Sequence, residues 1–313
     1  MTTATEPDAP AEQDLVFDIE HVTLRFGGVV SLNDVSMTMR RGEILAVIGP
    51  NGAGKTSLFN SLTGVYKPQQ GSIVAVGRAG EQARSVLGMK THVINHLGIA
   101  RTYQNIRLFP ALTALENVKI GIETRQKSGP IASMLGLPWQ RREERESSRT
   151  ALELLREVRL AERANELAGS LAYGEQRRLE IARALGTAPG VLLLDEPAAG
   201  TNPAEKRDLA ELIRRINRDR GTSVLLIEHD MKLVMSIADR IVVLNFGEKI
   251  AEGTPQAIQR DPVVVAAYLG TPGDDAADKA GDDVAPQPAM HLIDIDEVAA
   301  EHARADEDGT DHD

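Results

Sequence analysis

Short apolar runs alternate along the chain with longer stretches in which apolar side chains recur every three or four positions. The apolar runs predict buried strands at residues 43–49, 191–195, 223–229 and 240–247. A strand covered by helices on both sides needs such a run, because both faces of its pleat are buried. The alternation of strands and helices therefore predicts an α/β fold with a parallel sheet.

The N-terminal part of this region follows a different pattern. Residues 15–40 alternate apolar and polar side chains with a period of two, and turn residues stand at Gly27-Gly28 and at Asn33-Asp34. That pattern is typical of antiparallel strands with one solvated face. Residues 71–77 predict a further strand, so we expect a small antiparallel β subdomain here.

Helical spacing predominates in two other stretches. Residues 105–188, which include the charge-rich run 139–158, predict a helical subdomain inserted into the α/β domain. Residues 203–221 predict a single amphipathic helix that has Pro203 in its first turn and ends at Gly221.

The two ends of the chain differ from the rest in composition. Residues 1–14 and 271–313 hold too few apolar side chains to offset the entropy of ordering. Fourteen acidic and two basic side chains lie beyond residue 270, so the net charge of −11 belongs to this tail and the remainder is near neutral. We predict a disordered leader, an ordered domain over 15–270 and an acidic disordered tail. Helical spacing at 292–305 leaves a short docking helix as the alternative.

The composition also excludes several kinds of site. The 313-residue chain has no cysteine, which excludes disulfides and thiolate metal sites and is consistent with a reducing cytosol. Its longest apolar runs fall far short of the roughly 20 residues that span a bilayer, and its first residues do not resemble a secretory signal. We expect a soluble chain that reaches a membrane only through a partner.

The sequence GPNGAGKTS carries the first candidate chemistry. It matches the phosphate-loop pattern at Gly49, Gly54, Lys55 and Thr56, at a point where a predicted strand ends and a helix begins. Gly52 and Gly54 allow the backbone to turn its N–H groups toward an anion, and the helix N-terminus adds partial positive charge. Lys55 would reach the β- and γ-phosphates and Thr56 would ligate Mg²⁺. The expected ligand is ATP or GTP.

A second candidate is the Asp195-Glu196-Pro197 triplet at the end of a predicted buried strand. Asp195 would hold the metal that Thr56 also holds, and Glu196 would polarise the attacking water. Alone, such a triplet is more often a helix-capping turn. The phosphate loop upstream favours the metal-binding interpretation.

The order of these motifs resembles that of ABC-type ATPases. LAYGEQ, at 171–176, is similar to the family's signature and lies between the two motifs above, in the family's order. The helical spacing that follows predicts a helix that begins just after Gly174. Four further features match the family: the adenine-stacking aromatic at Phe26, the Q-loop at Gln104, the D-loop at 198–205 and the switch histidine at His229. The resemblance covers about residues 15–270.

Several stretches narrow the resemblance to the ATP-binding subunit of branched-chain amino-acid importers, the LivG type. They are 98–118, 171–185, 195–205, 226–255 and 261–270. Ala172 and Asn202 stand where ABC ATPases usually have Ser and Asp.

The resemblance implies a fold and a set of site residues. The implied fold is a P-loop ABC ATPase with a RecA-like parallel-sheet core. The implied nucleotide-binding residues are Phe26, Gly49, Pro50, Asn51, Gly52, Ala53, Gly54, Lys55, Thr56, Ser57, Leu171, Ala172, Tyr173, Gly174 and Glu175. The implied Mg²⁺ ligands are Thr56, Gln104 and Asp195, and the implied catalytic residues are Glu196 as general base, His229 and Gln104.

The resemblance also implies a function and partners. The chain would bind and hydrolyse ATP at the cytoplasmic face of the membrane and energise an importer. Its partners would be membrane permease subunits, a second ATP-binding subunit in a head-to-tail dimer and, indirectly, a solute-binding protein. A urea, amide or lipopolysaccharide system is the alternative within transport.

An ABC ATPase that clamps DNA or ribosomes is the alternative outside transport. The near-neutral folded part and the aromatic content of 3% argue against it. We therefore expect no nucleic-acid partner.

Overall fold

A computed structural model describes residues 15–124 and 138–269 of the chain. The predicted leader and acidic tail, with its alternative docking helix, lie outside the described residues. So does the segment 125–137 of the predicted helical subdomain.

Six strands form one sheet in the order β10-β9-β3-β8-β7-β6. The strands are β3 (Ile44–Ile48), β6 (Ile99–Arg101), β7 (Val191–Asp195), β8 (Ser223–Ile227), β9 (Arg240–Asn245) and β10 (Glu248–Gly253). Neighbours pair in parallel except β9 and β10, which pair antiparallel. Every residue of β3, β7 and β8 is buried, as the apolar runs predict.

Four strands form a second, antiparallel sheet in the order β2-β1-β4-β5. They are β1 (Leu15–Phe26), β2 (Val29–Arg40), β4 (Gln70–Ala75) and β5 (Arg84–Ser85). The predicted turn at Gly27-Gly28 is confirmed, since Phe26 pairs with Val29 across it.

The predicted turn at Asn33-Asp34 is wrong, because β2 continues through both residues. Asp34 has φ 54°, and the register with β1 is irregular around it. Its N–H donates to the Thr23 hydroxyl at 3.1 Å, and its carboxylate lies 2.7 Å from His21 Nδ1. The residue therefore makes a local irregularity in one strand rather than a chain reversal.

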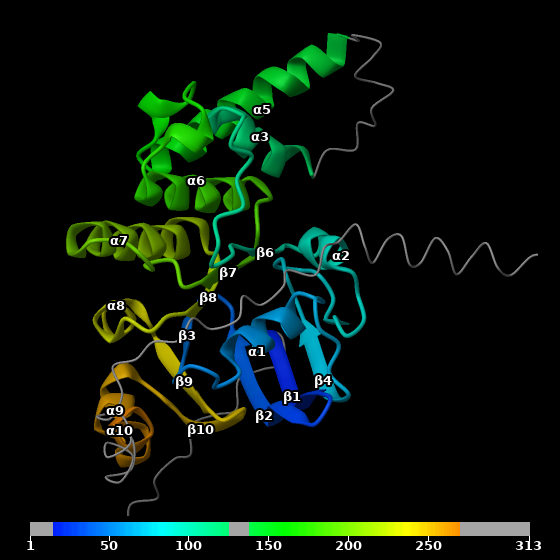
Figure 1. The fold of residues 1–313 in the computed structure, drawn as a ribbon. Helices are drawn as coiled ribbons and strands as arrows, with labels where there is room; N and C mark the ends of the chain where they lie inside the picture. The colour runs from blue at the N-terminus through cyan, green and yellow to red at the C-terminus, as the bar shows by residue number, and fades with distance from the viewer. Residues whose placement is uncertain (1–14, 125–137, 270–313) are drawn as a thin grey trace, which may run out of the picture. The chain divides into compact units, whose positions relative to one another are not determined.

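Helix α1 (Lys55–Leu62) packs between the two sheets (Figure 1). Its buried Leu58 and Phe59 belong to one core cluster with Phe17 of β1 and Val47 of β3. Because side chains from both sheets enclose α1, the loop that precedes the helix is held at a defined position.

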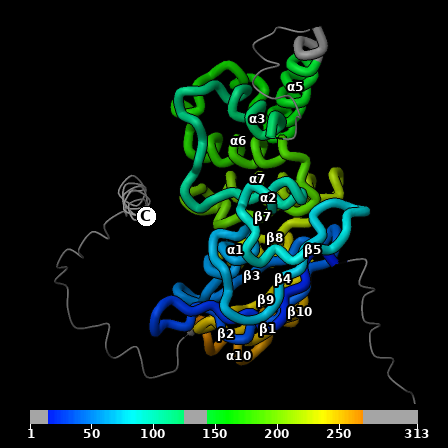
Figure 2. The backbone as a smooth tube through the Cα atoms, turned by 90° about the vertical axis from the view of Figure 1, so that its right-hand side faces the viewer, coloured from blue at the N-terminus to red at the C-terminus, as the bar shows by residue number. Residues whose placement is uncertain are grey.

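Four helices lie on the face of the parallel sheet opposite to α1. They are α3 (Ala114–Glu123), α5 (Pro138–Glu157), α6 (Tyr173–Gly186) and α7 (Pro203–Arg220). In Figures 1 and 2, α3, α5 and α6 lie together beyond α7. A second core cluster joins them to the sheet through side chains such as Val118, Leu179 and Leu192.

The ends of α7 confirm the predicted helix. The Asn202 side chain accepts hydrogen bonds from the Ala204 and Glu205 N–H groups at 2.9 and 3.0 Å, and Pro203 occupies the first turn. Gly221 closes the helix with φ 63°. Asn202 thus serves as an N-cap, a role that suits Asn as well as Asp.

Shorter helices complete the described structure. They are α2 (Thr91–His96), α8 (Met231–Ile237), α9 (Pro255–Arg260), α10 (Pro262–Leu269) and the 3₁₀ turns Ala161–Arg163 and Ala168–Ser170. Residues of α8, α9 and α10 pack on β9 in a third core cluster. Within 15–124 and 138–269, no helix combines the length and apolar character that crossing a bilayer requires.

We expect Leu226→Ala to lower the free energy of unfolding by about 2–5 kcal/mol, because it opens a cavity in a fully buried strand. Leu167→Ala is the matched control at a side chain that is 51% exposed, and its cost should stay within about 0.5 kcal/mol. Chemical denaturation measures both values. Equal losses would contradict the burial of β8.

Candidate functional site

The predicted phosphate loop connects β3 to α1 and is pressed against two other strands. A Cβ at Gly49 would come within 2.1 Å of the Leu244 carbonyl oxygen in β9. A Cβ at Gly54, where φ is 97°, would come within 2.5 Å of the Ser31 carbonyl oxygen in β2. Only glycine fits these two positions, so the loop keeps its open curve.

Lys55 is the buried cation of this loop. Its Nζ donates to the carbonyl oxygens of Gly49 and Pro50 at 2.7 and 2.8 Å. Burial lowers the pKa of the Lys55 ammonium, and the negative charges of Glu196 and Asp195 partly offset that effect. The ammonium therefore lies at the loop in the field of both carboxylates.

The start of α1 leaves donors for an anion. Gly54 provides no side-chain cap, and the first N–H groups of a helix have no acceptor within the helix. These groups and Lys55 can donate to phosphate oxygens. Thr56 is exposed next to them, as are Asn51 and Gly52. The Ser57 hydroxyl is 2.7 Å from that of Ser31 and supports the loop.

Asp195 ends β7 as a buried carboxylate paired with Arg101. Arg101 Nη2 lies 2.7 Å from Asp195 Oδ2. Arg101 Nη1 donates to Asn60 of α1 at 2.7 Å and to Thr63, the C-cap of that helix, at 3.1 Å. Arg101 thus joins the carboxylate to the helix of the phosphate loop. The sequence analysis missed this residue, because a basic side chain after an apolar run carries no signal of its partner.

The three predicted catalytic residues lie together: the side chains of Gln104 and His229 both approach one carboxylate oxygen of Glu196. Gln104 Nε2 donates to Glu196 Oε2 at 3.0 Å, and His229 Nδ1 lies 3.9 Å from the same oxygen. Glu196 has φ 46°, and its N–H donates to the Ile227 carbonyl oxygen at 2.9 Å. A strained backbone of this kind persists where the surroundings hold it. Here it turns the carboxylate toward Gln104.

The donor set near Glu196 suits Mg²⁺. This ion prefers oxygen ligands and is usually bound through only one or two carboxylates of the protein, with water and phosphate among the other ligands. The Asp195 carboxylate and the Thr56 hydroxyl are of that type, and so is the Gln104 side-chain oxygen. Among the described residues, no group of three or more His, Asp or Glu side chains is arranged to hold a metal by itself.

Phe26 lies at the end of β1 with its ring 44% exposed. The Tyr66 ring packs against it edge to face, with centroids 4.9 Å apart. An exposed aromatic face can stack on a flat base. Tyr66, which the sequence analysis missed, fixes the orientation of that face.

The signature-like segment does not join this cradle. In both views α6 lies apart from α1, with α7 between them (Figures 1 and 2). Leu171 is buried, Ala172 precedes the helix, and α6 begins at Tyr173. Gly174 therefore lies inside the first turn of α6. The prediction that it lies just before the helix is wrong. The cause is the Ala172 N–H, which donates to the Glu175 carboxylate at 3.1 Å and starts the helix earlier.

Glu228 is a third residue that the sequence analysis missed. This buried carboxylate accepts hydrogen bonds from the N–H groups of Ala198 at 2.7 Å, His229 at 3.0 Å and Asp230 at 3.2 Å. It ties the segment after Glu196 to the segment that carries His229. Its position inside an apolar run only indicated a strand end.

Comparison with known families shows which protein family the chain belongs to. Residues 32–199, more than half of the chain, match the family model described as "ABC transporter". The chain belongs to the ABC transporter family. It is an ATPase cassette of that family, as its motif order predicts, and its α/β fold is the one expected. Residues 248–274 match a second model, "Branched-chain amino acid ATP-binding cassette transporter".

The cassette is similar to several curated proteins over most of its length. It is 46% identical over 255 residues to the high-affinity branched-chain amino acid transport ATP-binding protein BraF of Pseudomonas aeruginosa, which covers 82% of this chain and 98% of BraF. It is 44% identical over 255 residues to LivG of Escherichia coli, with the same coverage of both chains.

Solved structures agree with this assignment. The cassette resembles a nucleotide-free ATP-binding cassette from an ABC transporter, with a TM-score of 0.69 and 30% identity over 82% of this chain and all of the other. It resembles equally the ADP conformation of an ATP-binding cassette of an ABC transporter, with a TM-score of 0.69 and 30% identity.

Lys55→Met should weaken nucleotide binding to the cassette by roughly ten- to a hundredfold, because a charge-assisted hydrogen bond to phosphate is lost. Equilibrium titration with a fluorescent ATP analogue measures the affinity. Lys67→Met, at an exposed lysine on the same subdomain, is the matched control and should leave it unchanged. Equal affinities in both variants would contradict the phosphate cradle.

Proposed function

We propose that the chain is the ATP-binding and ATP-hydrolysing subunit of an importer for branched-chain amino acids. The observation that carries the ATPase part is the convergence of Gln104 and His229 on the Glu196 carboxylate, next to the phosphate loop. The printed names of BraF and LivG support the substrate class, as does the family match at residues 248–274.

We assign the roles from the resemblance to ABC-type ATPases, and the positions of the side chains support them. Lys55 and the N-terminus of α1 hold the phosphates of ATP, and Phe26 stacks on adenine. Thr56, Asp195 and Gln104 would hold Mg²⁺, which would neutralise charge on the phosphates. Glu196 accepts a proton from the attacking water, and His229 orients the γ-phosphate.

Arg101 supports this arrangement through its contact with Asp195. It neutralises and orients the buried Asp195 carboxylate at 2.7 Å. A charge-assisted hydrogen bond of this kind holds a carboxylate in one geometry. We assign Arg101 as a positioning residue for the metal ligand.

A head-to-tail dimer completes the site. Since α6 lies apart from the phosphate loop of its own chain, the signature residues Leu171 to Glu175 serve the nucleotide of a second ATP-binding subunit. One similar solved structure, with a TM-score of 0.63 and 25% identity, is described as a dimeric bacterial ABC transporter cassette. Because Ala172 lacks a hydroxyl, the N-terminus of α6 supplies the contact to phosphate.

ATP binding favours the closed dimer, and hydrolysis removes that preference. A ligand shifts an equilibrium between two states only by its difference in affinity for them. The helical segment 105–188 acts as an inserted subdomain that passes this change to membrane permease subunits. The chain then works at the cytoplasmic face of the membrane as a peripheral subunit, with a solute-binding protein supplying the substrate.

Glu196→Gln should retain nucleotide binding and lower the rate of ATP hydrolysis by about 10²- to 10⁴-fold, because the general base is removed. It should also accumulate a dimer with Mg-ATP. Phosphate release and light scattering measure the two effects. Glu162→Gln, at an exposed glutamate, is the control. Unchanged turnover in Glu196→Gln would remove the residue from the role of base.

The tagged Glu196→Gln chain can be purified from detergent-solubilised membranes in the presence of Mg-ATP. We expect permease subunits and a second ATP-binding subunit to co-purify with it. Mass spectrometry identifies them, and an untagged chain is the control. Permeases of a urea, amide or lipopolysaccharide system would contradict the substrate class. Ribosomes, DNA-binding proteins or no membrane protein would contradict the transport role.

A further inference from the structure

A buried ion pair in α6 faces the segment that carries Gln104. Arg177 Nη1 lies 3.0 Å from Glu180 Oε2, and the two side chains are 1% and 2% exposed. Neither residue belongs to the nucleotide cradle described above. Arg177 directly follows the signature-like segment, and Glu180 lies about one helical turn further along α6.

The pair both donates hydrogen bonds to the backbone of residues 103–107 and accepts hydrogen bonds from it. Arg177 donates to the carbonyl oxygens of Tyr103 and Gln104, each at 2.6 Å. Glu180 Oε1 accepts from the N–H groups of Arg107 at 3.2 Å and Tyr103 at 3.4 Å. Residues 103–107 form no helix or strand, so α6 supplies partners that regular structure would otherwise provide.

This arrangement is costly in terms of stability. Burial raises the pKa of the Glu180 carboxyl, although hydrogen bonding from Arg107 and the charge of Arg177 act against it. In the described part of the chain Arg177 Nε is buried and has no hydrogen-bond partner. A buried ion pair is often no more stabilising than apolar side chains of similar volume. The pair is better explained by the geometry that it imposes on residues 103–107.

Arg177 also contacts the signature-like segment. Arg177 Nη2 donates to the Tyr173 hydroxyl at 3.3 Å. The Tyr173 ring packs on the D-loop, where a Cβ at Gly200 would lie 3.2 Å from Tyr173 Cε1. Gly174 packs against the Glu205 carboxylate at the start of α7, where a Cβ would lie 2.9 Å from Oε1.

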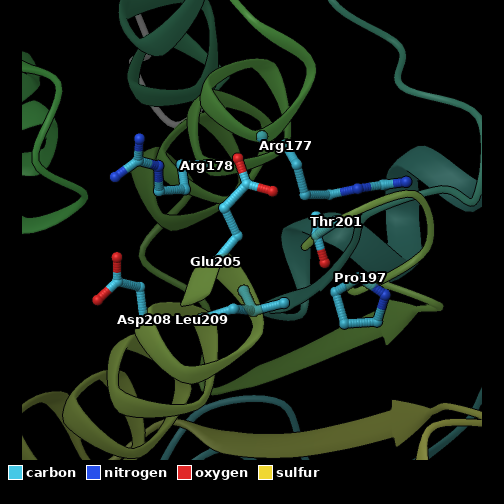
Figure 3. A pocket seen from close by; sticks show the side chains of 8 residues that line it. Arg177, Arg178, Pro197, Thr201, Glu205, Asp208 and Leu209 are labelled. Carbon is cyan, nitrogen blue, oxygen red and sulfur yellow. The ribbon is translucent and has the colours of Figure 1, made fainter. Parts of the chain in front are cut away.

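A cavity of about 50 Å³ lies between α6 and the D-loop at this junction. Figure 3 shows the side chains of Glu205 and Thr201 beside it, with Arg177 and Arg178 leaving α6 in opposite directions. Arg177 is therefore the side chain of this junction that reaches the Gln104 backbone.

We propose that Arg177 is a positioning residue that couples Gln104 to the signature-like segment of the same chain. When the Gln104 backbone shifts toward a nucleotide bound in its own cradle, the two short bonds carry the shift to Arg177 and on to Tyr173 and Gly174. That this movement then changes the contact with the partner's nucleotide rests on the proposed function. Bonded networks with two arrangements are a physical route for such coupling.

Hydrogen–deuterium exchange on the full chain tests the coupling. The protein is kept at a concentration at which light scattering gives a monomer, with and without Mg²⁺ and a non-hydrolysable ATP analogue. In the wild type, nucleotide should slow exchange at the phosphate loop, at 103–107 and at 171–176. In Arg177→Met the phosphate loop should keep this response, whereas the response at 171–176 should fall by about fivefold or more.

Two further variants keep the test decisive. Arg215→Met removes another arginine that bonds to a carbonyl, that of Glu157 at 2.8 Å, and should behave as the wild type. Arg177→Lys keeps the charge, but a single ammonium does not reproduce the fixed fork on two carbonyls, so its response should be intermediate. If Arg177→Met does not fold, Arg177→Lys decides.

The outcomes separate this proposal from the proposed function. No nucleotide response at 171–176 in the wild type overturns the coupling. So does a full response in Arg177→Met, or in Arg177→Lys where the Met variant does not fold. Failure of the wild type to dimerise with nucleotide at higher concentration contradicts the head-to-tail dimer instead, and leaves the exchange result on the monomer to decide the role of Arg177.

Discussion

Parallel pairing of β3, β7, β8 and β6 is the constraint on which the site depends. Asp195 at the end of β7 pairs with Ile227 at the end of β8, and β3 pairs along the same β8. Parallel strands end at the same edge of a sheet, and ligands of open α/β sheets bind outside the carboxyl ends of their strands. The phosphate loop, Glu196, His229 and Gln104 each follow one of these strands, so the sheet itself brings them to one edge.

Buried charged side chains then hold the segments that leave this edge. Arg101 joins Asp195 to α1, and Glu228 joins the D-loop to the segment of His229. The pair Arg177 and Glu180 joins α6 to the Gln104 segment. Burying such groups costs free energy unless each finds partners. Their recurrence at this edge indicates that loop geometry, rather than stability alone, requires them.

The same arrangement is consistent with the proposed head-to-tail dimer. The cradle lies between the two sheets and α1, whereas the signature-like segment lies beyond α7 (Figure 1). In the proposed head-to-tail dimer a second chain brings its own α6 to the cradle, so the occupancy of one site is linked to the position of the other chain. Arg177 gives that link a route inside each subunit, since it contacts both the Gln104 backbone and Tyr173.

Periodicity along the chain was enough to predict the buried strands, the amphipathic helix α7 and the antiparallel sheet, because each depends on neighbours two to four residues apart. Two local expectations were wrong for the same reason. Asp34 is a residue type that favours turns, but its N–H donates to the Thr23 hydroxyl of β1 and it stays within a strand. Gly174 lies inside the helix because the Glu175 carboxylate accepts from the Ala172 N–H and starts the helix earlier. In both cases a hydrogen bond outweighed the preference of the residue type.

Residue type and spacing alone predict which side chains carry the chemistry: Lys55, Thr56, Asp195, Glu196, Gln104 and His229 stand in motifs that can be read in order along the chain. Tertiary structure decides which residues hold those side chains in place. The bond from Arg101 to Asp195 spans 94 positions and that from Arg177 to Gln104 spans 73. No periodic pattern reports contacts at such separations, because they arise only when the strands pair and α6 packs against the segment after β6.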